Sequence, residues 1–253
     1  MPRPRIASDV AIGCVDASLA RGGRRVVEGV TFDLLRGRVL AIMGSTGSGK
    51  STLLAAFSGV ADVTLVGGTA HVDGIPIGKR GRAGRVRQYV TGVPGQEDGA
   101  RLPARLTVSE VISEPVNSRD RRVNARALAL RVASLLDELE LPLGIASSYP
   151  YELSSGMRQR VALARALVLQ PRVLVCDEPY ANLDLEVRSA VRGALVRRRE
   201  EEAMAILMAS NDTDAIRGLD ADVLVLRAGH PVGFGHGPSD VLWTPDEQTR
   251  LSA

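Results

Sequence analysis

Hydrophobic residues form three short unbroken runs, each long enough for one buried strand. The runs are "RVLAIM" at residues 38–43, "RVLVC" at 172–176 and "AILMA" at 205–209. Apolar stretches of this length are typical of parallel strands that are covered on both faces. Glycine-rich or polar residues follow each run, and parallel sheets bind ligands at the carboxyl ends of their strands. We therefore predict a mostly parallel sheet with a ligand site at that edge.

Helical periodicity separates these strands. Residues 122–140 carry apolar side chains at helical spacing, residues 186–202 carry a second apolar stripe, and a further helix is expected from about Lys50. Alternating strands and helices predict an α/β fold. The alternation breaks between residues 96 and 172, which predicts an inserted helical subdomain at about 97–160. The core then comprises residues 1–96 and 161–253 of a single domain.

The N-terminal part has a different pattern. Residues 10–40 predict short strands with turns at "RGG", 21–23, and "LRG", 35–37. In "TAHVDGIPI", residues 69–77, Asp73-Gly74 lies between two apolar stretches and predicts a hairpin. We therefore expect an antiparallel β portion ahead of the parallel core.

Composition narrows the class of protein. The chain has 253 residues, 45% of them hydrophobic, which is enough to bury a core without disulfides. Cys14 and Cys176 have no metal-ligand spacing, so we expect a reduced, cytosolic chain. No apolar run approaches the roughly 18 residues of a membrane span. Asp9 and Asp16 interrupt the only stretch that could pass for an export signal.

The chain uses arginine for almost all of its positive charges and lysine at only two positions. The net charge is +3, and of the 32 Lys and Arg residues only two are lysines, Lys50 and Lys79. The basic cluster at residues 79–87 predicts a solvated loop, with contact to phosphate or to a partner as the alternative. Aromatic residues make up only 3% of the chain, which leaves little for base stacking, so no nucleic-acid partner is expected.

A phosphate-binding loop is predicted directly after the first buried run, in "GSTGSGKST". Its glycines allow backbone N–H groups to converge on phosphate, and the helix that follows adds partial positive charge. Lys50 supplies a compact cation for the terminal phosphates of a nucleotide, and Ser51 offers a hydroxyl to Mg²⁺. A flexible glycine turn is the alternative, but it does not explain the position between strand and helix. The predicted contacts are Gly44, Ser45, Thr46, Gly47, Ser48, Gly49, Lys50, Ser51 and Thr52.

Two carboxylates follow the second buried run, in "VLVCDEP". Asp177 is suited to hold Mg²⁺ through water, and Glu178 is suited to polarise an attacking water. An acidic pair after a strand can also cap a helix. Together with the Lys50 loop, the pair predicts nucleotide hydrolysis.

The stretch "YPYELSSGMRQRVALARAL", residues 149–167, resembles the signature of the ATP-binding-cassette family. That signature is a leucine-serine-glycine-glycine loop opening a helix, and here Ser155 replaces the first glycine. The resemblance implies that Ser154, Ser155 and Gly156 cap the γ-phosphate of an ATP held by a facing subunit. It also implies that two cassettes enclose two nucleotides.

Other family motifs follow in register. Gln96 matches the glutamine that contacts Mg²⁺ and relays to membrane subunits, with Gln88 as the weaker alternative. "ANLD", residues 181–184, resembles the D-loop, which implies that Asp184 reaches the facing nucleotide. Arg21 stands near the position where the family has an adenine-stacking aromatic residue.

The polar residues after the third buried run resemble the family's switch loop. Ser210, Asn211 and Asp212 occupy its threonine-histidine-aspartate positions. The histidine contacts the γ-phosphate and the attacking water, whereas asparagine carries no charge and shuttles no proton. We therefore expect Asn211 to make hydrolysis at this site slow.

The finer resemblance is to importer ATPases for oligopeptides, dipeptides and nickel, although "MRQR" also occurs in sulfonate and nitrate importers. It implies permease subunits, an extracytoplasmic solute-binding protein, and a position on the cytoplasmic face of the membrane. We expect a second ATPase subunit in a heteromeric pair. The alternatives are a degenerate cassette that only completes a sister site, and a soluble cassette protein acting on nucleic acid.

Overall fold

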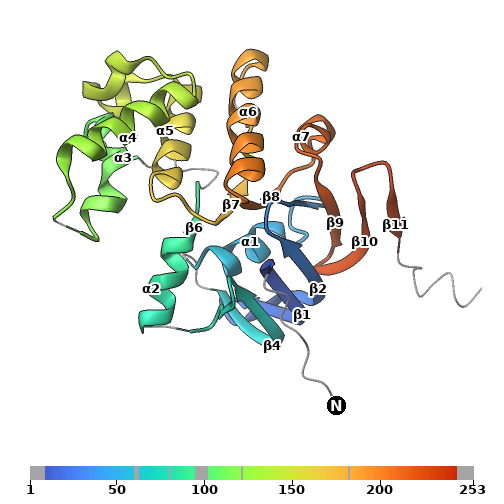
Figure 1. Ribbon diagram of the computed structural model, residues 1–253. Coiled ribbons are helices and arrows are strands. Elements are labelled where there is room, and N and C mark those ends of the chain that lie inside the picture. The colour runs from blue at the N-terminus through green and yellow to red at the C-terminus, as the bar shows by residue number, and fades with distance from the viewer. Residues whose placement is uncertain are drawn as a thin grey trace, which may run out of the picture.

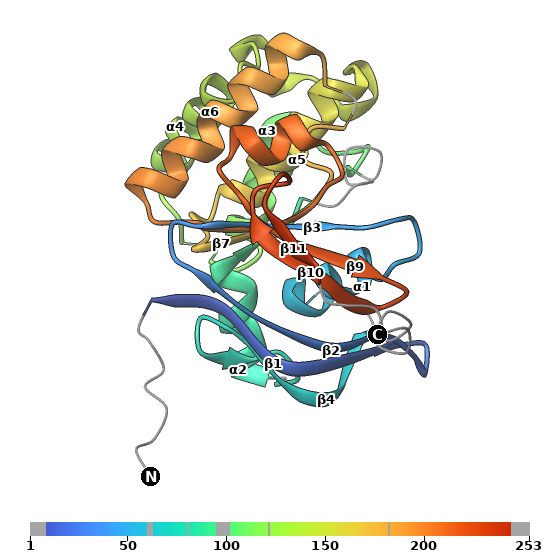
Figure 2. The ribbon, with the colours of Figure 1, turned by 90° about the vertical axis from the view of Figure 1, so that its right-hand side faces the viewer.

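The computed structural model describes residues 9–59, 63–79, 81–94, 102–120, 122–181 and 183–243. They form two sheets with helix α1 (Lys50–Ser58) between them and a layer of helices over the outer face of the larger sheet (Figures 1 and 2). This is the predicted combination of an N-terminal antiparallel portion and a mostly parallel α/β core.

The antiparallel sheet has the strand order β2-β1-β4-β5. Its strands are β1 (Val10–Arg21), β2 (Arg24–Leu35), β4 (Val63–Val72) and β5 (Ile75–Pro76). The chain turns at the three places predicted, but β1 and β2 have 12 residues each, so the prediction of short strands was wrong. The register between β1 and β2 shifts between Cys14 and Ala17, and Asp16 there has a φ of 52°. Such a bulge lets polar residues interrupt the alternation without ending the strand.

The larger sheet has the order β11-β10-β9-β3-β8-β7-β6. The three predicted strands are its central neighbours, β3 (Val39–Met43), β8 (Ala205–Ala209) and β7 (Val173–Asp177). They run parallel to one another and to β6 (Thr91–Gly92) and β9 (Asp222–Arg227). Strands β10 (His230–His236) and β11 (Val241–Trp243) extend the sheet in the antiparallel sense; the sequence pattern had not singled them out.

Alternate residues of the central strands supply two separate cores. Leu40 and Ile42 of β3 face α1 and the antiparallel sheet, while Val39 and Ala41 face the helical layer. That layer includes α5 (Ser155–Leu167), α6 (Leu185–Glu201) and α7 (Thr213–Gly218) (Figure 2). Because both faces are covered, the central strands are apolar throughout, as the unbroken runs predicted.

Between β6 and β7 the described residues contain helices and no strand. Helix α3 (Val108–Asn117) and helix α4 (Ala125–Glu138) are followed by the 3₁₀ turns η1 (Leu143–Ser147) and η2 (Pro150–Glu152), which lead into α5. Helix α4 falls within the predicted 122–140 segment. The boundaries of the helical subdomain remain a prediction, because residues 95–101 lie outside the described ranges.

One ion pair fastens α4 to the core. Arg198 of α6 is 3% exposed and donates from two nitrogens to the Glu138 carboxylate, at 2.9 and 2.6 Å. A two-point bond between an arginine and a carboxylate fixes orientation as well as distance. The pair therefore fixes the position of α4 relative to α6, the helix that follows β7.

Most of the basic cluster is helical. Arg82, Arg85 and Arg87 lie on helix α2 (Gly81–Val90), and Arg87 is buried, with its guanidinium donating to the carbonyl oxygens of Pro76 and Ile77. Burial lowers the pKa of Arg87. The prediction of a solvated loop was wrong, because one arginine faces inward and joins α2 to the end of the antiparallel sheet.

Both cysteines are buried and free, and burial raises the pKa of the Cys14 thiol to about 12. Over the described ranges, none of the helices combines the length and the apolar character needed to span a bilayer.

Candidate functional site

The carboxyl ends of β3, β7 and β8 meet at one edge of the large sheet, as the strand prediction required. A cavity of about 310 Å³ opens there. Most of its lining comes from the loop after β3, from the end of β7 and from the residues after β8. The lining residues are Val26, Thr46, Gly47, Gly49, Lys50, Ser51, Thr52, Asp177, Glu178 and Asn211.

The loop between β3 and α1 depends on glycine at two positions. Gly44 has a φ of 147°, and a Cβ there would collide with the Leu226 carbonyl oxygen and come within 2.6 Å of Ser48 Oγ. Gly49 precedes α1 with a φ of 105°, and a Cβ there would lie 2.8 Å from Val27 Cγ2. Side chains at these positions would push the loop out of its fold.

Lys50 is held at the mouth of this loop. Its ammonium donates to the carbonyl oxygens of Gly44, at 2.6 Å, and of Ser45, at 3.0 Å. Since a lysine has three N–H groups, one remains for an anion. Among the described residues, no side chain caps the first turn of α1, so its orphan N–H groups are also left for a ligand. This is the donor set that the phosphates of ATP require.

Ser51 and Asp177 form a pair of oxygen atoms suited to Mg²⁺. Ser51 Oγ donates to Asp177 Oδ2 at 2.9 Å. Magnesium prefers oxygen ligands at about 2.0–2.1 Å and takes most of them from phosphate and water. In the described part of the chain, no group of three or more His, Cys, Asp and Glu side chains is placed to hold a metal ion. The Ser51 hydroxyl and the Asp177 carboxylate fit an ion that takes its remaining ligands from phosphate and water.

Glu178 is held in an unusual backbone conformation. Its φ is 47°, and its N–H donates to the Ala209 carbonyl at 2.9 Å. Left-handed backbone at a residue other than glycine costs free energy and is concentrated at functional sites. The buried hydroxyl of Ser210 donates to the Glu178 carboxylate at 3.1 Å. These contacts fix the direction of a carboxylate that lines the cavity.

Gln159 contacts the residues that follow β7, and sequence analysis had not identified it. Its side-chain amide, on α5, donates to the carbonyl oxygens of Glu178, at 3.4 Å, and of Pro179, at 3.3 Å. The helix opened by the signature stretch is thus joined directly to the end of β7.

Asn211 makes two hydrogen bonds to one residue of the phosphate loop. Its Nδ2 donates to the Gly44 carbonyl at 3.1 Å, and its Oδ1 accepts from the Gly44 N–H, also at 3.1 Å. Both ends of the amide are engaged. Asn211 therefore fastens β8 to the start of the loop, a role that the comparison with the family's histidine had not predicted.

The remaining predicted residues lie elsewhere. Arg21 is exposed at the end of β1, opposite Arg24, and does not line the cavity, whereas Val26 does. Gln96 lies outside the described residues. Gln88 is on α2 and lines a different cavity.

The residues predicted to reach a facing nucleotide cap two helices. Ser154 Oγ accepts from the Met157 N–H at 3.2 Å at the start of α5, and Ser155 is the first helical residue. Asp184 caps α6 by accepting from the Val187 N–H at 3.0 Å. Since Ser155 has helical backbone, its conformation does not require glycine.

A parallel sheet that carries this loop, its lysine and the paired carboxylates defines a P-loop nucleotide-binding protein. The family model described as ABC transporter matches residues 27–181, more than half of the chain. The chain belongs to the ABC transporter family, as the motifs indicated.

The chain is 36% identical over 218 residues to the oligopeptide transport ATP-binding protein OppD of Mycobacterium tuberculosis, covering 85% of this chain and 35% of that protein. It is 29% identical to OppF of Escherichia coli, covering 83% and 63%. A putative peptide import ATP-binding protein of Brucella abortus is 33% identical, covering 85% and 65%. The chain thus spans between about a third and two thirds of the length of these relatives.

Solved structures agree on the fold. A dimeric ATP-binding cassette, MJ0796, in a post-hydrolysis state bound to ADP and Pi is similar with a TM-score of 0.78 and 24% identity, over 87% of this chain and 96% of that chain. The cbiO1 subunit from Clostridium perfringens, part of the ABC transporter complex cbiONQ, has a TM-score of 0.77 and 26% identity, over 90% and 89%. The predicted fold class is confirmed.

Proposed function

We propose that this chain is the ATP-binding and ATP-hydrolysing subunit of a membrane transporter that imports peptides or a related small solute. One observation carries the enzymatic part: Lys50, the Ser51–Asp177 pair and Glu178 line a single cavity. The printed functions of the OppD, OppF and Brucella relatives support peptides as the solute. The predicted roles of the loop residues 44–52 and of Gln96 belong to the same proposal.

In this mechanism the chain binds the terminal phosphates through Lys50 and the N–H groups at the start of α1. Ser51 and Asp177 would hold Mg²⁺, which neutralises charge on the phosphates when bound. Glu178 orients a water and accepts its proton as the water oxygen attacks the γ-phosphorus, and ADP is the leaving group. Ser210 keeps the Glu178 carboxylate directed into the cavity.

A second ATPase subunit would face the start of α5. Ser154 uses a lone pair on the Met157 N–H but keeps its own hydroxyl proton, which is free to donate to a phosphate. Ser155 and Gly156 add the backbone of the helix N-terminus, and Asp184 lies at the start of α6. We infer that these residues contact the nucleotide bound by the facing subunit, and that Arg21 lies against the adenine of this chain's own ATP.

The state of Asn211 favours a heteromeric, asymmetric pair. One N–H and the oxygen of its amide are bonded to Gly44, and the amide carries no charge, so it cannot give a transition state the support of a protonated histidine. The site on this chain would bind ATP well and turn over slowly, beside a sister subunit with a complete set. A cassette that only completes the sister site, with little hydrolysis of its own, is the alternative to this proposal.

Asn211→His in the assembled complex should raise ATP turnover. A preorganised donor of this kind is worth about 10²-fold in rate, and a histidine cannot reproduce both bonds to Gly44, which frees its ring for the phosphate. The ATPase rate is measured beside the unmodified complex. Asn211→Ala serves as the control, since it releases Gly44 without adding a donor. An unchanged rate in Asn211→His, with Glu178→Gln in this chain still stopping transport, would contradict the asymmetry.

The cavity between β6, α3 and α5 is a suitable place for a permease segment. It measures about 220 Å³ and includes Val93, Ser118, and the Glu114–Arg165 ion pair of 2.9 Å. It adjoins the chain that leads to Gln96, the residue expected to relay between nucleotide and membrane subunits. We propose that a cytoplasmic segment of a permease binds there, which places the chain at the cytoplasmic face of the membrane, with an extracytoplasmic binding protein acting through the permease. In this scheme residues 97–160 form the helical subdomain of a single cassette.

Purification with its native partners tests this function. We expect the chain to copurify with integral membrane proteins and to hydrolyse ATP faster when the solute and its binding protein are added. Copurification with nucleic acid and stimulation by it would instead support a soluble cassette protein.

A further inference from the structure

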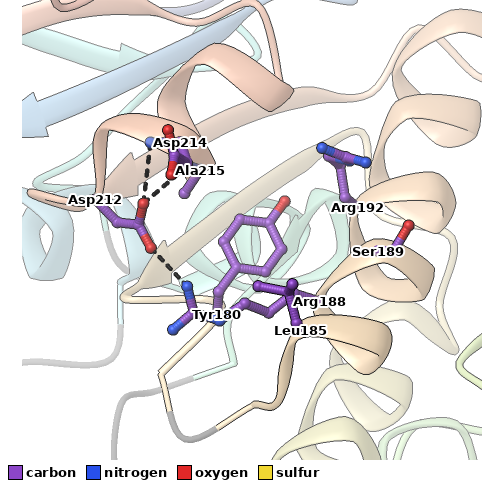
Figure 3. A pocket seen from close by; sticks show the side chains of 8 residues that line it. All are labelled: Tyr180, Leu185, Arg188, Ser189, Arg192, Asp212, Asp214 and Ala215. Atoms are coloured by element: carbon purple, nitrogen blue, oxygen red, sulfur yellow. Dashed lines mark hydrogen bonds and ion pairs between the residues drawn. The ribbon is translucent and has the colours of Figure 1, made fainter.

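The loop before α6 and the loop after β8 are joined by one arginine. Arg188, in the first turn of α6, donates from Nε to the Leu183 carbonyl at 3.1 Å. Its Nη1 donates to Asp212 Oδ2 at 2.8 Å (Figure 3). Leu183 directly precedes Asp184, so the bridge connects the segment expected to face a second subunit with the segment that follows Asn211.

Asp212 is held firmly on its other side. Its Oδ1 accepts from the N–H groups of Asp214, at 3.0 Å, and Ala215, at 3.1 Å, and thereby caps α7 (Figure 3). The bond from Ala215, with those from Asp214 and Arg188, lowers the pKa of the Asp212 carboxyl. Asp212 therefore stays ionised near neutral pH and keeps its bond to Arg188.

The contacts continue from Asp212 to the candidate base. The backbone N–H of Asp212 donates to Ser210 Oγ at 3.1 Å, and Ser210 Oγ donates to Glu178 Oε2 at 3.1 Å. Ser210 is 1% exposed, so water does not compete for its hydroxyl. Accepting from Asp212 fixes the oxygen of Ser210 and leaves its proton for Glu178.

We propose that Arg188 and Ser210 are positioning residues for Glu178, and that they transmit the placement of the loop before α6 to the carboxylate that activates water. The proposal rests on the function proposed above, because it takes Glu178 as the base and Asp184 as a contact to the facing nucleotide. Contact with the facing nucleotide fixes the position of the loop before α6, and Arg188 carries that position to Asp212. The backbone N–H of Asp212 then orients the Ser210 hydroxyl, which directs the Glu178 carboxylate.

The planar guanidinium is essential to this bridge. It reaches two acceptors in different directions, whereas a lysine ammonium is a single point charge. Arg192, one turn further along α6, lines the same cavity of about 380 Å³ as Arg188 (Figure 3). Because Arg192 has no hydrogen bond to either loop among the described contacts, Arg192→Gln is a matched control for the loss of one positive charge.

The test measures ATP turnover and nucleotide affinity of an assembled complex whose sister subunit has lost its own catalytic carboxylate, so that only this chain's site hydrolyses ATP. Arg188→Gln and Ser210→Ala should each lower kcat by about tenfold or more, since small displacements of a catalytic group cost up to about 10²-fold. The Kd for ATP should stay at the wild-type value, and each variant should remain folded and assembled at the assay temperature. Ser210→Thr, which keeps a hydroxyl, should restore the rate, and Arg192→Gln should match wild type.

Non-additivity gives the decisive comparison. If the residues act through Glu178, adding Arg188→Gln or Ser210→Ala to Glu178→Gln should produce no further loss of kcat. Wild-type turnover in Arg188→Gln, or the full additional loss on top of Glu178→Gln, would overturn the positioning role alone. An assembly in which Glu178→Gln hydrolyses ATP normally would instead contradict the proposed function of Glu178.

Discussion

Replacing Lys50 with alanine should abolish tight ATP binding, raising Kd by about 10- to 100-fold. The loop loses the ammonium that Gly44 and Ser45 hold at its mouth. Bonds from a cation to phosphate oxygens are among the strongest polar contacts in proteins, at about 1.5–3 kcal/mol each. The measurement is a titration of the purified chain with a fluorescent ATP analogue in the presence of Mg²⁺.

Two controls sharpen the Lys50 result. Lys79→Ala removes the other lysine of the chain, which is exposed and does not line the cavity, and should bind ATP as wild type does. Lys50→Arg keeps the charge but places a broad fork in the loop, so affinity should still fall. If Lys50→Ala bound ATP with unchanged affinity, the proposed binding of the terminal phosphates by this loop would be wrong.

Glu178→Gln should leave ATP binding intact and lower turnover by about 10²-fold or more. The amide keeps the size of the side chain and can still contact Ser210, but it cannot accept a proton from water. Steady-state ATP hydrolysis is measured in an assembled complex whose sister subunit has lost its own catalytic carboxylate, so that the signal comes from this chain's site, and nucleotide affinity is measured alongside. Glu201→Gln, at the exposed end of α6, is a neutral control. Equal turnover in Glu178→Gln and wild type would mean that another group activates the water.

The central strands and the phosphate loop could be predicted because their signals are local. An unbroken apolar run identifies a strand with two covered faces, and the three runs are indeed adjacent in the sheet. Asp177 directly follows the second run, and Lys50 lies at the end of the short loop that follows the first run, so adjacent parallel strands bring both residues to one edge of the sheet. The family motifs then narrowed the class without any knowledge of contacts.

The contacts of Asn211 and Ser210 could not be predicted in the same way. Asn211 bonds to Gly44 across 167 residues of sequence, and Ser210 bonds to Glu178 across 32. Their partners depend on which strands are neighbours and on side-chain direction, neither of which periodicity records. The sequence showed only that a polar group replaces histidine, and the structure shows where both ends of that group are bonded.

Helix α2 illustrates a different limit. Its charge made residues 79–87 resemble a solvated loop, because pattern alone does not separate an arginine that faces water from one that is buried. Arg87 lies inward because the carbonyl oxygens of Pro76 and Ile77 accept its protons. Such compensation of a buried charge by backbone acceptors arises only in the folded chain.

Uptake of a labelled oligopeptide by proteoliposomes is the most direct test of the central claim. The complete transporter is reconstituted with ATP on the side of the nucleotide-binding subunits and with the peptide and its binding protein on the other. The account predicts accumulation of peptide that requires ATP and Mg²⁺ and is lost when this chain carries Glu178→Gln. ATP hydrolysis with no peptide accumulation, or accumulation that is indifferent to Glu178→Gln, would contradict it.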